Sequence, residues 1–312
     1  MAQVVVAGSF IQDLVFSVDT LPSPGETRIA RLSTGPGGKG SNQAIACSRQ
    51  GVKTLFIGAV GDDVAGREYA EFARREGLET ALEVRRDAHT GRASILVDRT
   101  SQNMIAVAPG ASERLSVEHV EGLRSRIERA SVLLVQLEAN LAAVERALEI
   151  ARAAGVTTIL NPAPIHADVS AIQLAHADIL TPNETEFAHL LEQLHGVRLP
   201  ARFWEEPDEA LDPHCRVLGC PTIVLTLGEH GAFVSRALEP PLRVPAARVH
   251  PVDTTGAGDA FSGALAAGLV HHKGDLLQAL HLATAAAGLS TQKAGAALSM
   301  PTAEEVRGYL GR

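Results

Sequence analysis

The feature that most restricts the fold of this chain is the regular alternation of short β-branched runs with longer amphipathic stretches. The runs QVVVAG (3–8), SVLLVQLE (131–138) and VTTILNPAP (156–164) are typical of strands buried on both faces. The stretches 63–77 and 141–155 have the apolar periodicity of helices, and each ends at a glycine. This alternation predicts an α/β fold, in which helices cover both faces of a mostly parallel sheet.

The chain has 312 residues, of which 46% are hydrophobic, so its length allows one large α/β domain or two modest ones. We expect a single domain over residues 1–312. Two regions, within 10–34 and 92–107, alternate polar and apolar residues without a helical period. They predict an antiparallel flap with one apolar face, which would cover a ligand or meet another subunit. Residues 196–220 are rich in Pro, Asp and Glu and predict a surface excursion.

Charge and cysteine content exclude several classes of protein. The formal net charge is −8, which argues against a nucleic-acid or membrane-surface protein. We find no run of 18 apolar residues and no signal-peptide pattern, and the three cysteines suggest no disulfide framework, so we expect a cytoplasmic protein. Cys215 and Cys220 lie near His214 with C-x4-C spacing; ordinary loop cysteines explain them better than a metal site.

Polar residues follow several predicted strands. Asp13, Glu138, Asn161 and Asn183 each come after an apolar run. Ligands of parallel α/β sheets bind beyond the carboxyl ends of the strands. The sequence therefore predicts one binding site at that edge of the sheet.

A glycine-rich segment, GPGGKGSNQA (35–44), contains G-x-G-x-x-G at Gly35, Gly37 and Gly40. A dinucleotide fingerprint should follow the first strand of a βαβ unit, whereas this segment follows the flap. One interpretation is a tight turn into a helix. The other is a bare loop that a polar ligand approaches closely, with Lys39 and Asn42 as hydrogen-bond donors.

A second glycine-rich segment, VDTTGAGDAF (252–261), passes from a loop into an apolar helix. The amides of Gly256, Ala257 and Gly258 at a helix N-terminus would hold an anion. Asp259 either complements the helix dipole or accepts a proton from a hydroxyl that attacks phosphorus. We favour the second role, because an anion-binding loop beside a base suits phosphoryl transfer.

Two further segments suit a nucleotide. TPNETE (181–186) places Asn183 and Glu186 three residues apart, as either a helix cap or a holder of magnesium. TLGEHG (226–231) supplies a hydroxyl and two glycines at another strand end, where a nucleotide can approach closely.

These segments together resemble the ribokinase/PfkB family of carbohydrate kinases. GGKGSNQA near the start and DTTGAGDAF near the end carry the resemblance, with QLE, NPAP, TPNETE and TLG in the same order between them. The similarity spans about residues 3–301 and is greatest to the ribokinase or deoxyribokinase branch. It implies a Rossmann-like α/β domain with a small β-lid that often forms a dimer contact. It also implies ATP-dependent phosphorylation of a sugar hydroxyl, with Mg²⁺ and a K⁺ activator.

The resemblance also assigns roles by matched position. Asp259 would be the base, and Gly256, Ala257 and Gly258 the anion hole. The sugar would be held by Ile11, Asp13, Gly38, Lys39, Asn42 and Glu138. The nucleotide would lie along Asn183, Thr226, Gly228, Gly231 and Thr284, with Glu186 organising magnesium through water. The potassium site would be formed by Asp253, Thr255, Ser290, Lys293, Gly295 and Ser299, several of them through carbonyls.

One residue departs from the ribokinase pattern. In GSFIQD, Ile11 stands where ribokinases carry an asparagine that contacts sugar hydroxyls, and relatives resembling deoxyribokinases carry an apolar residue there. A ribose hydroxyl buried against Ile11 would lose partners, at a cost of about 1–3 kcal/mol. The substitution points to 2-deoxyribose as well as ribose, unless Ile11 only packs under the lid.

Two other functions compete with a sugar kinase. A nucleoside kinase of the same fold would need an apolar slot for the base, and the lid offers only Phe10 and Phe16. A sugar- or nucleotide-binding regulator that has lost catalysis would not need Asp259 with the glycines beside it. We expect ATP and a small sugar as partners, no nucleic acid or membrane, and a homodimer formed through the lid.

Overall fold

The computed structural model describes residues 1–100, 102–170 and 174–311, and the main sheet of these residues has nine strands. In sheet order they are β13 (Leu242–Val244), β12 (Ala232–Arg236), β11 (Thr222–Thr226), β10 (Ile179–Leu180), β9 (Thr157–Asn161), β8 (Val132–Gln136), β1 (Val4–Ala7), β4 (Thr54–Gly61) and β5 (Glu79–Arg85). Neighbours from β11 to β5 pair in parallel, and β12 and β13 are antiparallel. The predicted α/β fold with a mostly parallel sheet is confirmed.

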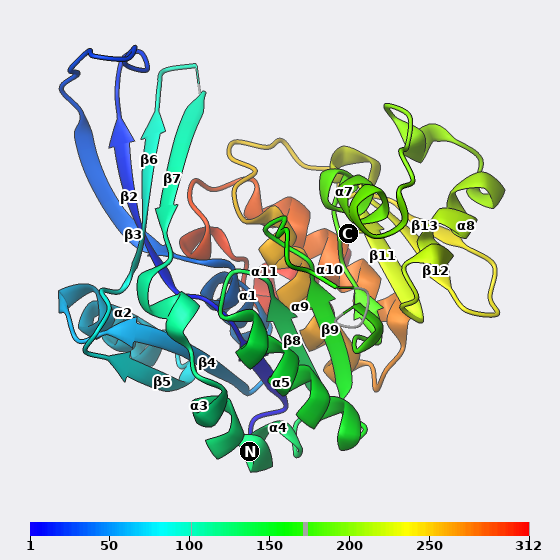
Figure 1. The fold of residues 1–312 in the computed structure, drawn as a ribbon. Helices are drawn as coiled ribbons and strands as arrows, with labels where there is room; N and C mark the ends of the chain where they lie inside the picture. The colour runs from blue at the N-terminus through cyan, green and yellow to red at the C-terminus, as the bar shows by residue number, and fades with distance from the viewer. Residues whose placement is uncertain (101, 171–173, 312) are drawn as a thin grey trace.

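Helices cover both faces of this sheet, as Figure 1 shows. One core contains side chains of α3 (Val117–Gly122), α4 (Arg124–Ile127), α5 (Leu141–Ala153), α7 (Glu184–His195) and α8 (Asp208–Val217). The opposite core contains those of α1 (Lys39–Arg49), α2 (Val64–Arg75), α9 (Ala257–His271), α10 (Leu276–Ser290) and α11 (Ala303–Leu310). In β1, Val5 and Ala7 pack into the first core, and Val4 and Val6 into the second. A strand buried on both faces explains the continuous apolar run.

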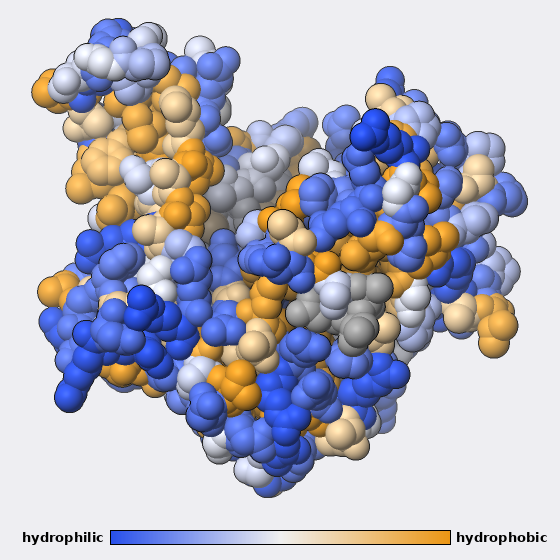
Figure 2. Space-filling model, viewed as in Figure 1, coloured by the Kyte–Doolittle hydropathy of each residue, from blue (hydrophilic) through white to orange (hydrophobic). Residues whose placement is uncertain are grey.

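A second sheet of four described strands projects from the main body (Figure 1). Its order is β3 (Arg31–Gly37), β2 (Ile11–Ser17), β6 (Gly91–Val97) and β7 (Asn103–Ala108). The outer pairs are antiparallel, but β2 and β6 run parallel, so the predicted wholly antiparallel flap is wrong for the central pair. Figure 2 shows hydrophobic side chains gathered on this sheet. Its exposed large apolar residues are Leu32, Met104, Ile105 and Val107.

The region 196–220 is more ordered than its composition predicts. It contains the short helix η2 (Phe203–Glu205) and the ten-residue helix α8. Leu211 and Cys215 are buried in the first core, together with Phe203. The four-residue spacing of Leu211 and Cys215 is helical. Most residues of 196–220 are exposed or half-buried, so the segment lies at the surface as predicted, but a few apolar residues dock α8 onto the core.

The carboxyl ends of β1, β8, β9 and β10 meet at one edge of the main sheet, as parallel strands must. Glu138 and Asn183 follow β8 and β10 there. Asp13 differs from the expectation, because it lies inside β2 rather than in a loop after β1. Within the described ranges, no helix combines the length and apolar character that crossing a bilayer requires.

Candidate active site

The loop before α9 turns at Gly256, whose φ is 76°. A side chain at Gly256 would come within 3.2 Å of Ala296, so the turn packs closely against the segment before η4 (Ala297–Ser299). The amides of Gly256 and Gly258 have no hydrogen-bond partner among the described residues, whereas that of Ala257 donates to the Thr254 carbonyl at 3.2 Å. Two of the three amides predicted to bind an anion are therefore free at a helix N-terminus, where the helix dipole favours negative charge.

Asp259 lies in the first turn of α9 and is only 6% exposed. Both of its carboxylate oxygens accept hydrogen bonds from neighbouring residues of α1. Asn42 Nδ2 donates to Oδ2 at 2.8 Å, and Gln43 Nε2 donates to Oδ1 at 2.9 Å. The carboxylate is therefore held beside the free amides of the preceding turn.

The start of α1 packs its bare backbone against the segment that joins β1 to β2. Gly38 has a φ of 83°, and a Cβ there would lie 2.6 Å from the Ile11 amide nitrogen. The Lys39 amide donates to Glu138 Oε2 at 2.8 Å, and the Ser9 hydroxyl donates to the same oxygen at 2.5 Å. This close approach, which needs a glycine at position 38, brings α1, β2 and the end of β8 to one place.

Several charges gather at this place. Burial raises the pKa of Asp13 to about 6, and the nearby carboxylates of Glu138 and Asp259 add to the effect. Burial acts to lower the pKa of Lys39, but the carboxylates of Asp259, Glu138 and Glu186 outweigh it and leave that pKa above its usual value. The ammonium group of Lys39 offsets part of the negative charge of these acids.

The segment TPNETE forms the cap of α7. Asn183 Oδ1 accepts from the Glu186 amide at 2.8 Å, and Glu186 Oε2 accepts from the Asn183 amide at 2.9 Å, which is a capping box. Burial raises the pKa of Glu186, although the Asn183 amide and the Lys39 charge act against it. Thr226 at the end of β11 forms a backbone bridge with Asn183 and donates its hydroxyl to the Pro182 carbonyl. The two predicted nucleotide segments are thus neighbours.

The turn between β11 and β12 needs glycine for its own geometry. Gly228 and Gly231 have φ of 51° and 85°. A Cβ on Gly231 would lie 2.0 Å from the Val244 carbonyl oxygen of β13. Thr284 lies within α10, and its hydroxyl donates to the His281 carbonyl at 3.1 Å.

Asp253 ties together the two loops predicted to hold potassium. Its Oδ1 accepts from the Thr255 amide and its Oδ2 from the Gly295 amide, each at 2.9 Å. Partial burial acts to raise the pKa of Asp253, but these hydrogen bonds outweigh it and hold the pKa below its usual value. The amine of Lys293 lies 2.6 Å from Glu305 Oε1, so it is paired with α11.

Ser290 and Ser299 are fully buried near these loops. Their hydroxyls donate to the carbonyls of Ala287 and Ala296, each at 2.8 Å. Each hydroxyl oxygen therefore keeps lone pairs for another partner.

The comparison with known proteins decides the family. The model described as "pfkB family carbohydrate kinase" matches residues 1–303. The chain belongs to the pfkB family. Over 304 residues it is 38% identical to "Ribokinase" of Mus musculus. The aligned region covers 96% of this chain and 92% of the mouse protein.

Two other similarities extend over the whole kinase. The pfkB-family chain is 33% identical over 317 residues to "Deoxyribokinase" of Salmonella typhimurium, covering 98% of each protein. The structure of Arabidopsis thaliana ribokinase complexed with ribose and ATP matches with a TM-score of 0.83 at 29% identity, over 100% of this chain and 99% of that one. The predicted ribokinase-like fold and the predicted carbohydrate kinase, a phosphotransferase, are confirmed.

Ile11 of this pfkB kinase lies at the base of the small sheet and is 2% exposed. It pairs with Gly91 of β6 and Gly37 of β3, and a Cβ on Gly91 would lie 2.4 Å from Ile11 Cδ1. Ile11 and Asp13 are two residues apart in β2 and so project from the same face. The apolar side chain therefore lies on the face of the small sheet that carries Asp13.

Sequence reasoning did not assign Gln43 and Gln136 to the site of the kinase. Both are fully buried. Gln136 Nε2 donates to Gln43 Oε1 at 2.6 Å, and Gln43 in turn donates to Asp259. The signal in the sequence was an amide that ends the apolar run VLLVQ, because a buried polar side chain needs a partner.

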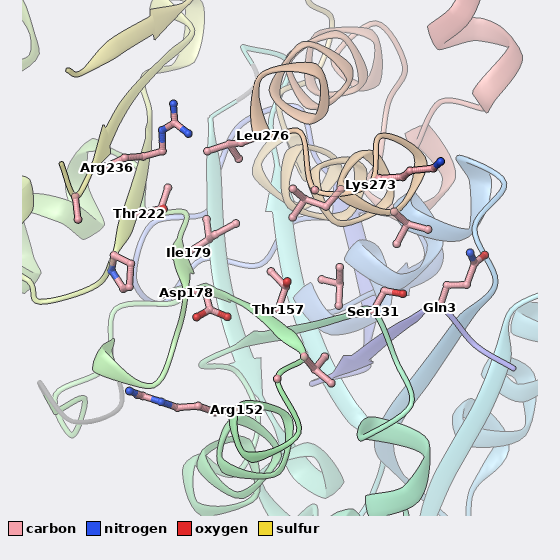
Figure 3. A pocket seen from close by; sticks show the side chains of 18 of the residues that line it. Gln3, Ser131, Arg152, Thr157, Asp178, Ile179, Thr222, Arg236, Lys273 and Leu276 are labelled. Carbon is pink, nitrogen blue, oxygen red and sulfur yellow. The ribbon is translucent and has the colours of Figure 1, made fainter. Parts of the chain in front are cut away.

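A large groove of this kinase lies at the other edge of the main sheet (Figure 3). It has a volume of about 910 Å³ and is lined at the amino ends of β9 and β11 by Thr157 and Thr222. Arg152 donates to the Ala175 carbonyl, and Arg236 is paired with Glu239. In Figure 3 the labelled cations lie on different sides of the groove and do not converge. The polar and charged side chains that do gather at one place are those at the carboxyl ends of the parallel strands.

Proposed function

We propose that this pfkB-family kinase transfers the terminal phosphoryl group of ATP to a primary hydroxyl of a pentose, either ribose or 2-deoxyribose. The observation that carries the proposal is the buried Asp259 carboxylate beside the free amides of Gly256 and Gly258. Its relatives named ribokinase and deoxyribokinase, and the ribokinase solved with ribose and ATP, support the substrates.

In the proposed reaction Asp259 accepts the proton of the sugar hydroxyl. The hydroxyl oxygen forms a bond to the terminal phosphorus as the bond from phosphorus to the bridging oxygen breaks, so that ADP leaves. The amides of Gly256 and Gly258 stabilise the charge on the transferred group. The Ala257 amide joins them if it exchanges the Thr254 carbonyl for the phosphoryl oxygen.

The sugar would be held by groups that still have hydrogen-bonding capacity. The Asp13 carboxylate accepts no hydrogen bond from the described residues, and Asn42 Oδ1 is buried without a partner there. Glu138 uses Oε2 for Ser9 and Lys39, which leaves Oε1 for a hydroxyl. Gly38 lets the sugar approach the backbone, and Lys39 adds a positive charge.

Ile11 would select between the two pentoses. It lies on the same face of β2 as Asp13 and has no hydrogen-bonding group. A ribose hydroxyl against it would be left without a partner, whereas 2-deoxyribose lacks a hydroxyl at one position.

The nucleotide would lie along Asn183, Thr226, Gly228 and Gly231, with Thr284 of α10 beside it. Magnesium keeps several waters and takes few carboxylates. Glu186 fits this chemistry, because it is 8% exposed and its Oε1 has no described partner. Magnesium would neutralise phosphate charge, and Glu186 would hold its water.

A potassium ion would fit the loops joined by Asp253. Carbonyl and hydroxyl oxygens surround this place, and the Lys293 amine is paired with Glu305 rather than directed at the ion. The residues that would hold it are Asp253, Thr255, Ser290, Lys293 by its carbonyl, Gly295 and Ser299. A bound cation here would brace the loop that carries the free amides of α9.

The small sheet corresponds to the predicted lid. Its exposed apolar residues support the proposal of a homodimer formed through it. A cytoplasmic location stays a prediction.

The test is a coupled assay of ADP release with ribose, 2-deoxyribose, hexoses and nucleosides, run in parallel on Asp259→Asn. We expect turnover with a pentose, and a fall of about 10²–10⁴ in kcat for the variant with unchanged folding. Near-wild-type turnover in Asp259→Asn would refute the assigned base. Preference for a nucleoside, or sugar binding without ADP release, would favour the competing functions.

A further inference from the structure

The Asp259 carboxylate is held differently on its two oxygens. Asn42 donates to Oδ2, but its own Oδ1 is buried with no partner in the described chain. Gln43 donates to Oδ1, and all of its polar atoms are engaged. Asn42 therefore has one polar atom left for a sugar, whereas Gln43 has none.

Three hydrogen bonds determine the orientation of the Gln43 amide. Its Nε2 donates to Asp259 Oδ1 and to Asn161 Oδ1, each at 2.9 Å, and its Oε1 accepts from Gln136 at 2.6 Å. Asn161 is itself fixed, because its Nδ2 donates to the Thr181 carbonyl at 2.9 Å. A flipped Gln43 amide would set oxygen against two acceptors and nitrogen against a donor.

The network is also shielded from bulk water. Gln43 and Gln136 are fully buried, and Asn161 is 6% exposed. In such surroundings a broken hydrogen bond is not replaced by one to bulk water, so the arrangement resists disorder.

We propose that Gln43, locked by Gln136 and Asn161, is a positioning residue that commits Oδ1 of Asp259 and leaves Oδ2 as the oxygen that takes the proton. This inference rests on the proposed role of Asp259 as the base. When the sugar takes over the Asn42 amide, Oδ2 is released toward the hydroxyl while Gln43 keeps the carboxylate plane in place.

The test is Gln43→Met, which keeps the length of the side chain and removes its hydrogen bonds. We expect kcat to fall about 10- to 100-fold, with the KM values for sugar and ATP changed less than about threefold, because geometry and not affinity is lost. Gln136→Met, which frees the Gln43 amide without touching Asp259, should lower kcat in the same way but by less.

Gln50→Met is the matched control. Gln50 caps the same helix, is 3% exposed and donates to the Pro301 carbonyl at 2.8 Å. Its loss should lower thermal stability without lowering kcat. A folded Gln43→Met or Gln136→Met with wild-type kcat overturns the positioning role. If Asp259→Asn also keeps wild-type kcat, the proposed base has failed as well, and the two failures are distinguished.

Discussion

Replacing Asp13 by asparagine should stabilise the ligand-free protein, by an amount that grows with pH. Burial beside Glu138 and Asp259 raises the pKa of Asp13 from 3.8 to about 6. A raised pKa means that the folded state prefers the protonated carboxyl, so the wild-type protein loses stability as pH rises from about 4 through about 6. Asparagine cannot ionise and escapes this loss.

The size of the stability difference follows from the shift in the pKa of Asp13. About two pKa units correspond to a limit of about 3 kcal/mol, which is reached above pH 7 and weakened by the solvent that still reaches the carboxylate. By linkage the difference between Asp13→Asn and the wild type should grow by about 2 kcal/mol between pH 4.5 and 8. For a chain of this length each kcal/mol moves Tm by roughly 1.5 °C, so the melting difference should reach about 4 °C at pH 8.

The assay is a series of thermal or urea melts of the two proteins without ligand across this pH range. The Asp13 carboxylate has no described hydrogen-bond partner, so the asparagine loses no side-chain hydrogen bond within the protein. Asp19→Asn is the control, because that side chain is 76% exposed and pairs with Arg99 just beyond the ends of β2 and β6. A stability difference for Asp13→Asn that does not change with pH would refute the electrostatic reasoning. Asp13→Asn should also raise the KM for the sugar about 10-fold or more, because the variant loses an ionised hydrogen-bond acceptor.

Three further perturbations test other parts of the structure. Ile11→Asn should raise the kcat/KM ratio of ribose to 2-deoxyribose by about 5- to 150-fold, and an unchanged ratio would mean that residue 11 does not face the sugar. Potassium should stimulate turnover relative to lithium, and Asp253→Asn should weaken that stimulation; equal rates in both salts would remove the ion site. Gly38→Ala should lower stability by more than 1 kcal/mol in a urea melt, because its φ is 83° and its Cβ would meet the Ile11 backbone, whereas an unchanged midpoint would contradict that packing.

The segment that caps α7 shows what a local sequence pattern can and cannot predict. The spacing of Asn183 and Glu186 predicted either a helix cap or a metal holder, and the structure contains the cap. The cap uses one oxygen of Glu186 and leaves the other free. Sequence spacing alone does not separate the two roles, because the same side chain has capacity for both.

The sequence by itself determined the parallel sheet and the place of the candidate site. β-branched runs alternate with helical periods, and only a sheet covered on both faces buries such runs, so polar residues after strands such as β8 and β10 meet at one edge. The two glycine-rich segments could be recognised because backbone approach and a helix N-terminus depend on local sequence.

Only the tertiary structure decided how Asp259, the proposed base, is held and how the pKa values of the neighbouring acids are shifted. Gln43 lies 216 residues from Asp259 and 93 from Gln136 in sequence, so no local pattern pairs them. The raised pKa of Asp13 arises from burial and from carboxylates of other elements. Hydrogen bonds and desolvation act between atoms close in space, and it is the packing of α1 against β8 and α9 that brings these atoms together.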